Sequence, residues 1–398
     1  PLSNNTTGMQ NVAIGYLPLA SNTEGQQNVA LGFYALYANT TGERNFAAGS
    51  ALCSNTTGSY NNAIGASSLA KNTTGRYNTA LGHSALYTSL SGCHNFAAGQ
   101  CALYSNWGGC HNTAIGYLGL CSNTTGYGNN AIGQCALRCN TTGNENTGIG
   151  YRTLYKNTTG KYNNSIGSDA LYANTTGGCN IAIGLQALMC NTEGNLNAAL
   201  GAQALCSNTT GSSNQAIGCK ALTSNTTGYS NAAIGTDALR ENTTGCFNTA
   251  IGSCALRDSL SGCHNFAAGY QALYNNWGGC HNNGIGCKAL CSNTTGVDNQ
   301  AIGRYTLGSN TTGGYNVAMG YYALFSNTTG GYNAAIGSNA LACNTTGNCN
   351  YAIGIDALKY NTTGCSNVGI GNQSLCQNTT GCNNTAIGCR ALFTGLSG

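Results

Sequence analysis

The sequence predicts an all-β fold, a parallel β-solenoid (β-roll) in which each coil matches one copy of a seventeen-position repeat. The first observation is that this short repeat fills the chain. Gly8, Gly25 and Gly42 are evenly spaced, each seventeen positions after the last, and only the step from Gly42 to Gly58 is shorter, by one position. The repeat reads x-x-N-x-A-I-G-x-x-A-L-x-x-N-T-T-G, and its positions are numbered one to seventeen. A short fixed period is the sequence signature of a solenoid.

The second observation is the placement of the glycines. Gly occupies positions seven and seventeen of the repeat, and the apolar positions do not follow the spacing of a helix. Positions three to seven predict one strand, and positions nine to twelve predict a second. The closing Asn-Thr-Thr-Gly predicts a turn in which Asn and Gly adopt positive φ. Coils stacked in register would lie ~4.8 Å apart.

The domain organisation follows from the same repeat. Residues 1–398 are expected to form one uncapped array of about 23 coils. The chain starts at position ten of a repeat and stops at position seventeen, so we expect a fragment of a longer fibre. Residues 91–99 return as residues 261–269, which is ten repeats further along the chain (261 − 91 = 170). This offset indicates that a ten-coil block was duplicated, which lengthens a spacer.

The pattern of large and small residues predicts how the coils pack. Position eleven is Leu, as in Leu36, and position six is usually Ile or Leu, as in Ile14. We expect both to fill the coil interior. Neighbouring strand residues point to opposite faces, so Ala at position five and Gly at position seven would point outward. An outward face that stays small is expected to pack against another backbone, which predicts a bundle of parallel copies, most simply a homotrimer. The alternative is a single-chain solenoid whose small residues relieve crowding at a corner. Asn at position three is expected to form a hydrogen-bonded ladder.

One stretch carries a family resemblance. Residues 78–86 read Asn-Thr-Ala-Leu-Gly-His-Ser-Ala-Leu. This motif resembles the head repeats of trimeric autotransporter adhesins, and it looks even more like the Asn-Thr-Ala-Ile-Gly arrays of tail-fibre proteins from phages and large viruses. The resemblance implies a trimeric parallel β-roll on an extracellular or virion-borne fibre, often used for attachment. The 23 cysteines of this chain are a departure from those families.

The Asn-Thr-Thr of the turn matches the acceptor pattern for N-glycosylation. One glycan per coil could not fit at a spacing of ~4.8 Å, so any occupancy would be partial, and small O-linked sugars on residues such as Thr40 are an alternative. The alternative interpretation is a turn that matches the pattern by chance. The candidate acceptors are Asn39, Asn55, Asn72, Asn123, Asn140, Asn157, Asn174, Asn208, Asn225, Asn242, Asn293, Asn310, Asn327, Asn344, Asn361 and Asn378.

The cysteines occupy variable positions of the repeat, and some share a position in consecutive coils. In-register stacking would bring their Cα atoms within the range of a disulfide. The alternative is free thiols in a reducing environment. Cys246 also neighbours Cys263, so that column can pair only once. The candidate pairs are Cys93 with Cys110, Cys263 with Cys280, and Cys365 with Cys382.

Two further motifs are candidates for ligand contact. Cys93, His94, Cys110 and His111 have the composition of a zinc site, but adjacent strand residues point apart, so we expect no metal and no cofactor. Trp107 and Trp277 lie in turns before Gly-Gly and could contact a sugar or a receptor, or could cap a kink.

Composition excludes several functional classes. Charged residues make up 6% of the chain, and the net charge of +4 forms no Lys/Arg cluster, so no nucleic-acid partner is expected. No apolar run approaches the ~20 residues that span a membrane, so no membrane partner is expected. No nucleophile–base pairing stands out, so we expect no enzymatic activity.

The function that these observations predict is mechanical. We expect a structural fibre or stalk of an extracellular or virion-surface appendage, which acts as a spacer and could present attachment sites to cell-surface glycans or a receptor. Its principal partner would be itself, as a homotrimer or filament. The alternatives are a monomeric ice-binding β-solenoid and a glycan-binding β-solenoid.

Overall fold

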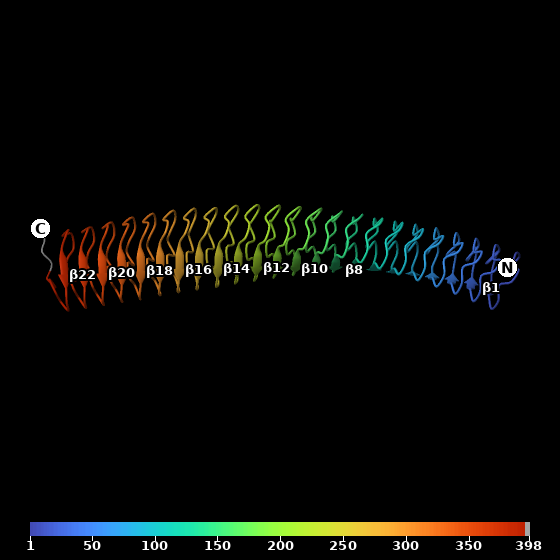
Figure 1. Cartoon of the computed structure of the whole chain (residues 1–398), viewed down its shortest axis with the longest axis horizontal. Coiled ribbons are helices and arrows are strands. Elements are labelled where there is room, and N and C mark those ends of the chain that lie inside the picture. The colour runs from blue at the N-terminus through green and yellow to red at the C-terminus, as the bar shows by residue number, and fades with distance from the viewer. Residues whose placement is uncertain (395–398) are drawn as a thin grey trace. The chain divides into compact units, whose positions relative to one another are not determined.

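The chain folds as a parallel β-solenoid, seen in a computed structural model that describes residues 1–394. Those residues contain no helix, and each coil contributes one strand of three residues. The chain divides into two compact units, residues 1–196 and residues 197–398. In each unit the strands stack in chain order (Figure 1). Paired residues such as Ala13 and Ala30 lie one repeat apart. The all-β solenoid, with one coil for each seventeen-position repeat, is therefore confirmed.

Every strand begins at position four of the repeat and ends at position six. The described part of the first unit contains β1 (Val12–Ile14), β2 (Val29–Leu31), β3 (Phe46–Ala48), β4 (Asn62–Ile64), β5 (Thr79–Leu81), β6 (Phe96–Ala98), β7 (Thr113–Ile115), β8 (Asn130–Ile132), β9 (Thr147–Ile149), β10 (Asn164–Ile166) and β11 (Ile181–Ile183). The described part of the second unit contains β12 (Ala198–Leu200), β13 (Gln215–Ile217), β14 (Ala232–Ile234), β15 (Thr249–Ile251), β16 (Phe266–Ala268), β17 (Asn283–Ile285), β18 (Gln300–Ile302), β19 (Val317–Met319), β20 (Ala334–Ile336), β21 (Tyr351–Ile353), β22 (Val368–Ile370) and β23 (Thr385–Ile387).

Strands of neighbouring coils within a unit pair in parallel and in register. Ala30 of β2, for example, lies opposite Ala47 of β3. The single shorter repeat does not disturb this register, because Phe46 still pairs with Asn62. The shortened turn is absorbed at Gly49, whose φ is 92° where that of Gly32 is 130°. Each position of the repeat therefore forms a column that runs through the coils of a unit.

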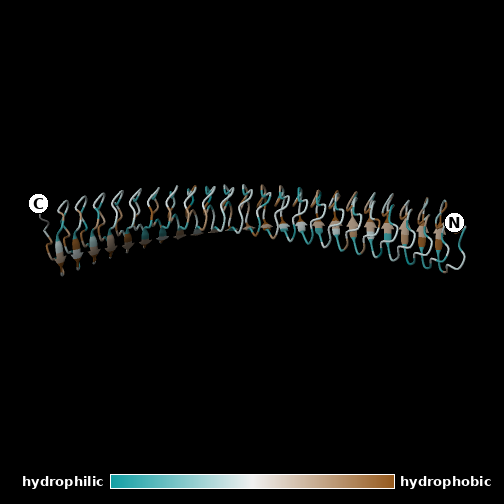
Figure 2. Cartoon of the chain, turned by 45° about the horizontal axis from the view of Figure 1, so that its top comes forward, coloured by the Kyte–Doolittle hydropathy of each residue, from teal (hydrophilic) through white to brown (hydrophobic). Residues whose placement is uncertain are grey.

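The core of each coil is thin. It consists of Ala at positions five and ten and Leu at position eleven, as in Ala30, Ala35 and Leu36, all with no exposed surface. In Figure 2 the ribbon alternates between hydrophobic and hydrophilic residues within each coil. Burial of the one Leu side chain contributes about 2 kcal/mol per coil, so the apolar core alone gives each coil little stability.

The predicted orientation of the strand was wrong. Ala63 at position five is completely buried, whereas Ile64 at position six is 46% exposed. The reason is the width of the interior. At Gly284, where position five lacks a side chain, an added Cβ would lie only 3.2 Å from the side chain of Leu273. The interior therefore accepts a methyl group at position five and has no room for a larger side chain, so Ile at position six faces outward.

The predicted second strand, at positions nine to twelve, was also wrong. This segment is a turn in which positions nine and eleven are left-handed, as in Tyr34 (φ 54°) and Leu36 (φ 51°). It still bonds to both neighbouring coils: Tyr34 N–H donates to Tyr16 O of the preceding coil at 3.0 Å, and Leu36 N–H donates to Ala51 O of the following coil at 3.1 Å. A left-handed Leu costs roughly 1–2 kcal/mol, which its burial and its hydrogen bond offset.

The Asn-Thr-Thr-Gly turn is present, but its predicted backbone was wrong. Asn39 and Gly42 do not have positive φ, which falls instead on positions two, seven, nine and eleven. Asn39 closes the turn through its side chain, whose Nδ2 donates to Gly42 O at 3.0 Å. Gly42 is required by space, because an added Cβ would lie 2.4 Å from both Asn39 Oδ1 and Gly58 O.

Gly at position seven is required by both conformation and space. Gly133 has φ of 131°, and an added Cβ would lie 2.4 Å from Gly150 O of the next coil. We therefore predict that Gly133→Ala destabilises the solenoid by about 3 kcal/mol or more, because it combines backbone strain with a clash against backbone. Thermal unfolding followed by circular dichroism measures the effect.

Gly119→Ala is the matched control. Gly119 occupies position ten, where most coils have Ala, and an added Cβ would lie 3.6 Å from Ala114 Cβ, an ordinary contact. We expect this substitution to leave the unfolding temperature unchanged or to raise it, by about 0.4–1 kcal/mol in stability. Equal losses from the two substitutions would contradict the close-approach argument.

Candidate interaction surfaces

The most extensive candidate surface in each unit is the strand face, formed by the outward side chains at positions four and six. The position-six residue is Ile in most coils, and Ile132, Ile166 and Ile183 are 38%, 43% and 41% exposed. None of the described strands contains a charged residue or a His. The strand face is therefore a continuous apolar column within each unit, beside a mixed column of small, polar and apolar residues.

At three levels the two columns of the strand face compensate each other in size, whereas β21 combines Tyr351 at position four with Ile353 at position six. Phe stands at position four in β3, β6 and β16, and these are the only described strands with Ala at position six. All other described strands have Ile, Leu or Met at position six. Size compensation is a property of packed positions, since water imposes no constraint on side-chain volume.

The predicted ladder at position three is confirmed; we call it the inner ladder. Asn129 donates its backbone N–H to Asn112 Oδ1 at 3.0 Å, and its Nδ2 donates to the same Oδ1 at 3.2 Å and to Gly143 O at 2.8 Å. Both residues are completely buried. The amide thus bonds coil to coil and strand to turn, which satisfies polar groups that the thin core would otherwise leave unpaired.

A second ladder, the turn ladder, is formed by Asn at position fourteen. Asn140 Nδ2 donates to Asn123 Oδ1 at 2.8 Å and to Gly143 O at 3.0 Å. All sixteen glycosylation candidates belong to this ladder, and none is more than 1% exposed. A glycan would replace one of the two hydrogens on Nδ2. In most coils both of these hydrogens already take part in hydrogen bonds. Glycosylation therefore stays a prediction, and a glycan would have to be attached before the chain folds into coils.

Within residues 1–394 the turn ladder is interrupted at Ser89 and Ser259, which replace Asn at position fourteen. A Ser side chain is too short to bridge the coils. Ser89 Oγ and Asn72 Oδ1 are buried without a partner, and so are Ser259 Oγ and Asn242 Oδ1. Buried unpaired groups cost stability.

The interruption coincides with the two Trp residues. Trp107 and Trp277 take the place of Thr at position fifteen and are 57% and 54% exposed. Each follows an exposed Leu at position fifteen of the preceding coil, and Leu90 N–H donates to Trp107 O at 3.1 Å. Elsewhere the Thr hydroxyl at this position is hydrogen-bonded, as in Thr141, whose Oγ1 donates to Thr158 O at 3.0 Å. The Trp residues therefore lie in an apolar patch of an otherwise polar column.

The Cys–His motif does not assemble into one site. His94 stacks on His111 with ring centroids 4.9 Å apart, while Cys93 Sγ donates to Ser91 O at 3.4 Å and Cys110 Sγ to Gly108 O at 3.6 Å. No group of three or more His, Cys, Asp or Glu side chains in the described part of the chain could hold a metal ion.

The predicted cysteine pairs lie at position one of consecutive coils, and their six cysteines are free thiols. Cys365 Sγ lies 2.9 Å from Cys382 Sγ. Sequence reasoning favoured Cys263 with Cys280, but the sulfur nearest to Cys263 Sγ is that of Cys246, also at 2.9 Å. Burial and the bond to Cys246 raise the pKa of the Cys263 thiol to about 11.

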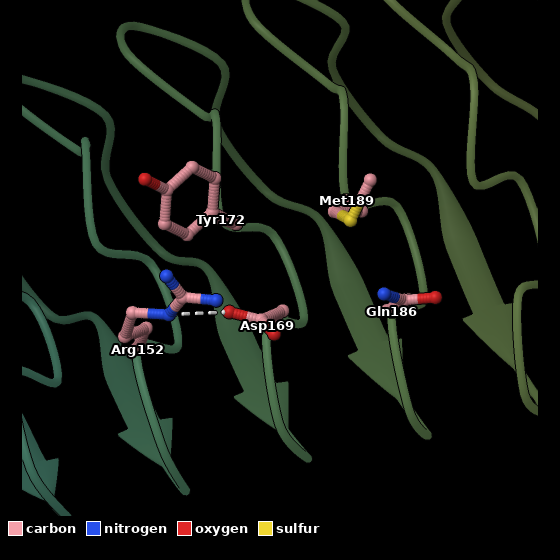
Figure 3. A pocket seen from close by; sticks show the side chains of 5 residues that line it. All are labelled: Arg152, Asp169, Tyr172, Gln186 and Met189. Carbon is pink, nitrogen blue, oxygen red and sulfur yellow. Dashed lines mark hydrogen bonds and ion pairs between the residues drawn. The ribbon is translucent and has the colours of Figure 1, made fainter.

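A pocket of about 250 Å³ opens in the first unit at positions nine and twelve. Figure 3 shows the ion pair at its floor, in which Arg152 Nε donates to Asp169 Oδ1 at 2.9 Å, below the ring of Tyr172. The hydrogen bond to Asp169 raises the pKa of Arg152. The lining is completed by Gln186 and Met189 and contains no Ser, Cys, Lys or His side chain.

Comparisons with known proteins add no family. No protein-family model matches the chain, and no curated protein matches it. None of the described residues forms a helix of the length and apolarity needed to cross a bilayer.

The ladder interruption gives a prediction. We expect Ser89→Asn to restore the turn ladder and to stabilise the chain by about 1–3 kcal/mol, because two buried polar atoms gain partners. The increase is measured as a higher thermal unfolding temperature. Ser253→Asn, at an exposed position, is the control and should change little. A loss of stability in Ser89→Asn would show that the Leu90–Trp107 turn itself requires Ser.

Proposed function

We propose that this chain is a segment of a structural fibre in which identical copies pack through their strand faces. The observation that carries the proposal is the exposed, uncharged Ile column at position six. Covering the exposed part of one Ile contributes on the order of 1 kcal/mol, and the term recurs in every coil. Because every coil adds a small favourable free energy, association is favoured along the whole length of a unit.

A second copy of the same chain is the partner that best fits this surface. An apolar face of constant composition, repeated coil after coil, is complementary to another face with the same repeat. The Phe–Ala coils support this assignment, since the loss of volume at position six offsets the gain at position four. At those three levels such compensation keeps the outline of the face close to that of the neighbouring coils.

Three copies are the favoured number. Three strand faces turned toward one axis would cover all three apolar columns at once. The resemblance of residues 78–86 to trimeric adhesin heads and tail-fibre arrays supports the same number and suggests an extracellular or virion-surface appendage. The fibre would act as a spacer, with no catalytic role.

The first alternative is a monomeric ice-binding solenoid, for which the Thr columns of the turn would be the active surface. The Thr hydroxyls at position fifteen already donate hydrogen bonds to backbone oxygens, as in Thr141, whose Oγ1 donates to Thr158 O. Only position sixteen offers exposed Thr hydroxyls, which argues against an ordered two-rank array. A thermal-hysteresis assay distinguishes this alternative.

A glycan-binding role has one observation in its favour, the exposed Trp107 and Trp277. An aromatic ring on a surface poor in charge can stack on the apolar face of a sugar. Attachment through these residues is compatible with the fibre, which would then present them. Binding to a glycan array, compared between the wild type and Trp107→Ala, tests this role separately.

Charge on the strand face tests the fibre. We predict that the wild type has about three times the mass of the 40.5 kDa chain in light scattering. The double substitution Ile132→Asp/Ile166→Asp should shift it to one chain mass, because carboxylates would be buried without partners. Thr125→Asp/Thr159→Asp, on exposed turn positions, is the control and should leave the mass unchanged. A wild type with one chain mass would overturn the proposal.

Size compensation gives an independent prediction. We expect Ala98→Ile to weaken association, because Phe96 and an added Ile would overpack the same level of the face by about 1–3 kcal/mol. Phe96→Thr/Ala98→Ile, which recreates the composition of β7, should restore it. Sedimentation equilibrium measures both variants. Equal association of the single and double variants would remove compensation as an argument.

A further inference from the structure

The backbone N–H at position one is frequently satisfied by the side chain at position one of the next coil. Tyr127 N–H donates to Asn144 Oδ1 at 3.0 Å, and Gly331 N–H donates to Asn348 Oδ1 at 2.7 Å. In some coils a cysteine takes the place of Asn. A short side chain with an acceptor atom at position one can thus satisfy this N–H, and sulfur can supply that atom.

This hydrogen bond aligns consecutive cysteines. Cys365 N–H donates to Cys382 Sγ at 3.1 Å, and Cys246 N–H donates to Cys263 Sγ at 3.2 Å. The sulfur of the second coil is thereby held beside the backbone of the first. In both pairs the two Sγ atoms lie 2.9 Å apart. Stacked coils also place the Cα atoms at ~4.8 Å, within the disulfide range of about 4.4–6.8 Å.

We propose that Cys365 with Cys382, and separately Cys246 with Cys263, form disulfides that join consecutive coils. The oxidant would be a small-molecule disulfide such as oxidised glutathione. The proposal does not depend on how copies of the chain associate, since both sulfurs of each pair belong to one chain.

Other cysteines at position one lack the same arrangement. Cys93 N–H donates to Cys110 Sγ at 3.2 Å, but the Cys93 thiol turns to Ser91 O. Cys263 N–H donates to Cys280 Sγ at 3.3 Å, but the Cys263 Sγ lies against the Sγ of Cys246 instead. The N–H···S bond is therefore common to all four pairs, and only two pairs also bring their sulfurs together.

The reaction is two successive exchanges. The Cys382 thiolate attacks one sulfur of oxidised glutathione, which forms a mixed disulfide and releases one glutathione thiolate. Cys365 then loses its proton to solvent and attacks the Cys382 sulfur, which forms the inter-coil bond and releases the second glutathione. Two protein thiols are oxidised and one glutathione disulfide is reduced to two thiols.

Cys382 is the attacking residue because its thiolate is the better stabilised. The hydrogen bonds from the Cys365 thiol and backbone N–H lower the pKa of Cys382, whereas the same thiol contact raises the pKa of Cys365. Burial raises the pKa of Cys263 to about 11. Because the thiolate is the nucleophile, we expect the pair of Cys365 and Cys382 to oxidise first.

The test is oxidation of the native chain with oxidised glutathione, followed by alkylation, trypsin digestion and tandem mass spectrometry. A bond between Cys246 and Cys263 would link peptides 241–257 and 258–288, which trypsin separates at Arg257. A bond between Cys263 and Cys280 would lie inside the second peptide and link nothing. The peptide 360–390 should lose two hydrogens, with Cys365 and Cys382 joined.

Variants test the order of the reaction. In Cys365→Ser, Cys382 should remain as a mixed disulfide with glutathione, and in Cys382→Ser, Cys365 should be modified several-fold more slowly. Cys110→Ser is the control and should leave both rates unchanged. The proposal is overturned if peptides 241–257 and 258–288 stay unlinked while 360–390 keeps all its thiols, or if Cys93 and Cys110 oxidise as fast as the proposed pairs.

Discussion

The close approach of one coil to the next is the constraint on which the rest of the structure depends. At Gly133 and Gly143 the space for a Cβ is filled by a backbone oxygen of the following coil, 2.4 and 2.5 Å from where that atom would lie. This spacing lets backbone groups bond directly between coils, and it brings Asn123 and Asn140 near enough to share a hydrogen bond. Register, ladders and turn geometry all follow from it.

The thin core explains why so much of the stabilisation is polar. A coil that buries only one Leu and two Ala residues gains little from the hydrophobic effect, so its buried Asn residues must be fully bonded to avoid a large penalty. The same thinness forces the remaining large apolar residue outward. Ile166 is exposed whereas Leu171 of the same coil is buried, and an apolar outer face is therefore a consequence of the coil's own geometry.

The repeat alone was sufficient to predict the solenoid, its period and the inner ladder, because these depend only on which positions recur. The repeat was not sufficient to predict which side chains of the strand face the interior of the coil. Ala63 and Ile64 are equally regular in the sequence, and which of them faces inward depends on the width of the coil. The pattern Asn-Thr-Thr makes Asn140 a candidate glycan acceptor and does not reveal its burial, because the pattern is the same for an exposed turn and for a buried ladder. The sequence placed the bundle interface on the small residues at positions five and seven, but these pack within one chain, and the exposed apolar column lies at position six.

At some variable positions of the repeat, several different side chains can supply the same hydrogen-bonding group. In some coils position one supplies an acceptor for the N–H of the coil before it, and Asn144, Asn348 and Cys382 all provide one. Cysteine could therefore enter this column without loss of the hydrogen bond, and two in succession place their sulfurs in the same column. Position fourteen is less tolerant, since Ser89 leaves two buried atoms unpaired where an exposed Leu and Trp replace Thr. The loss of stability from these unpaired atoms recurs in both units, each time beside an exposed Leu and Trp. This coincidence fits a turn surface that has a role other than the stability of its own coil.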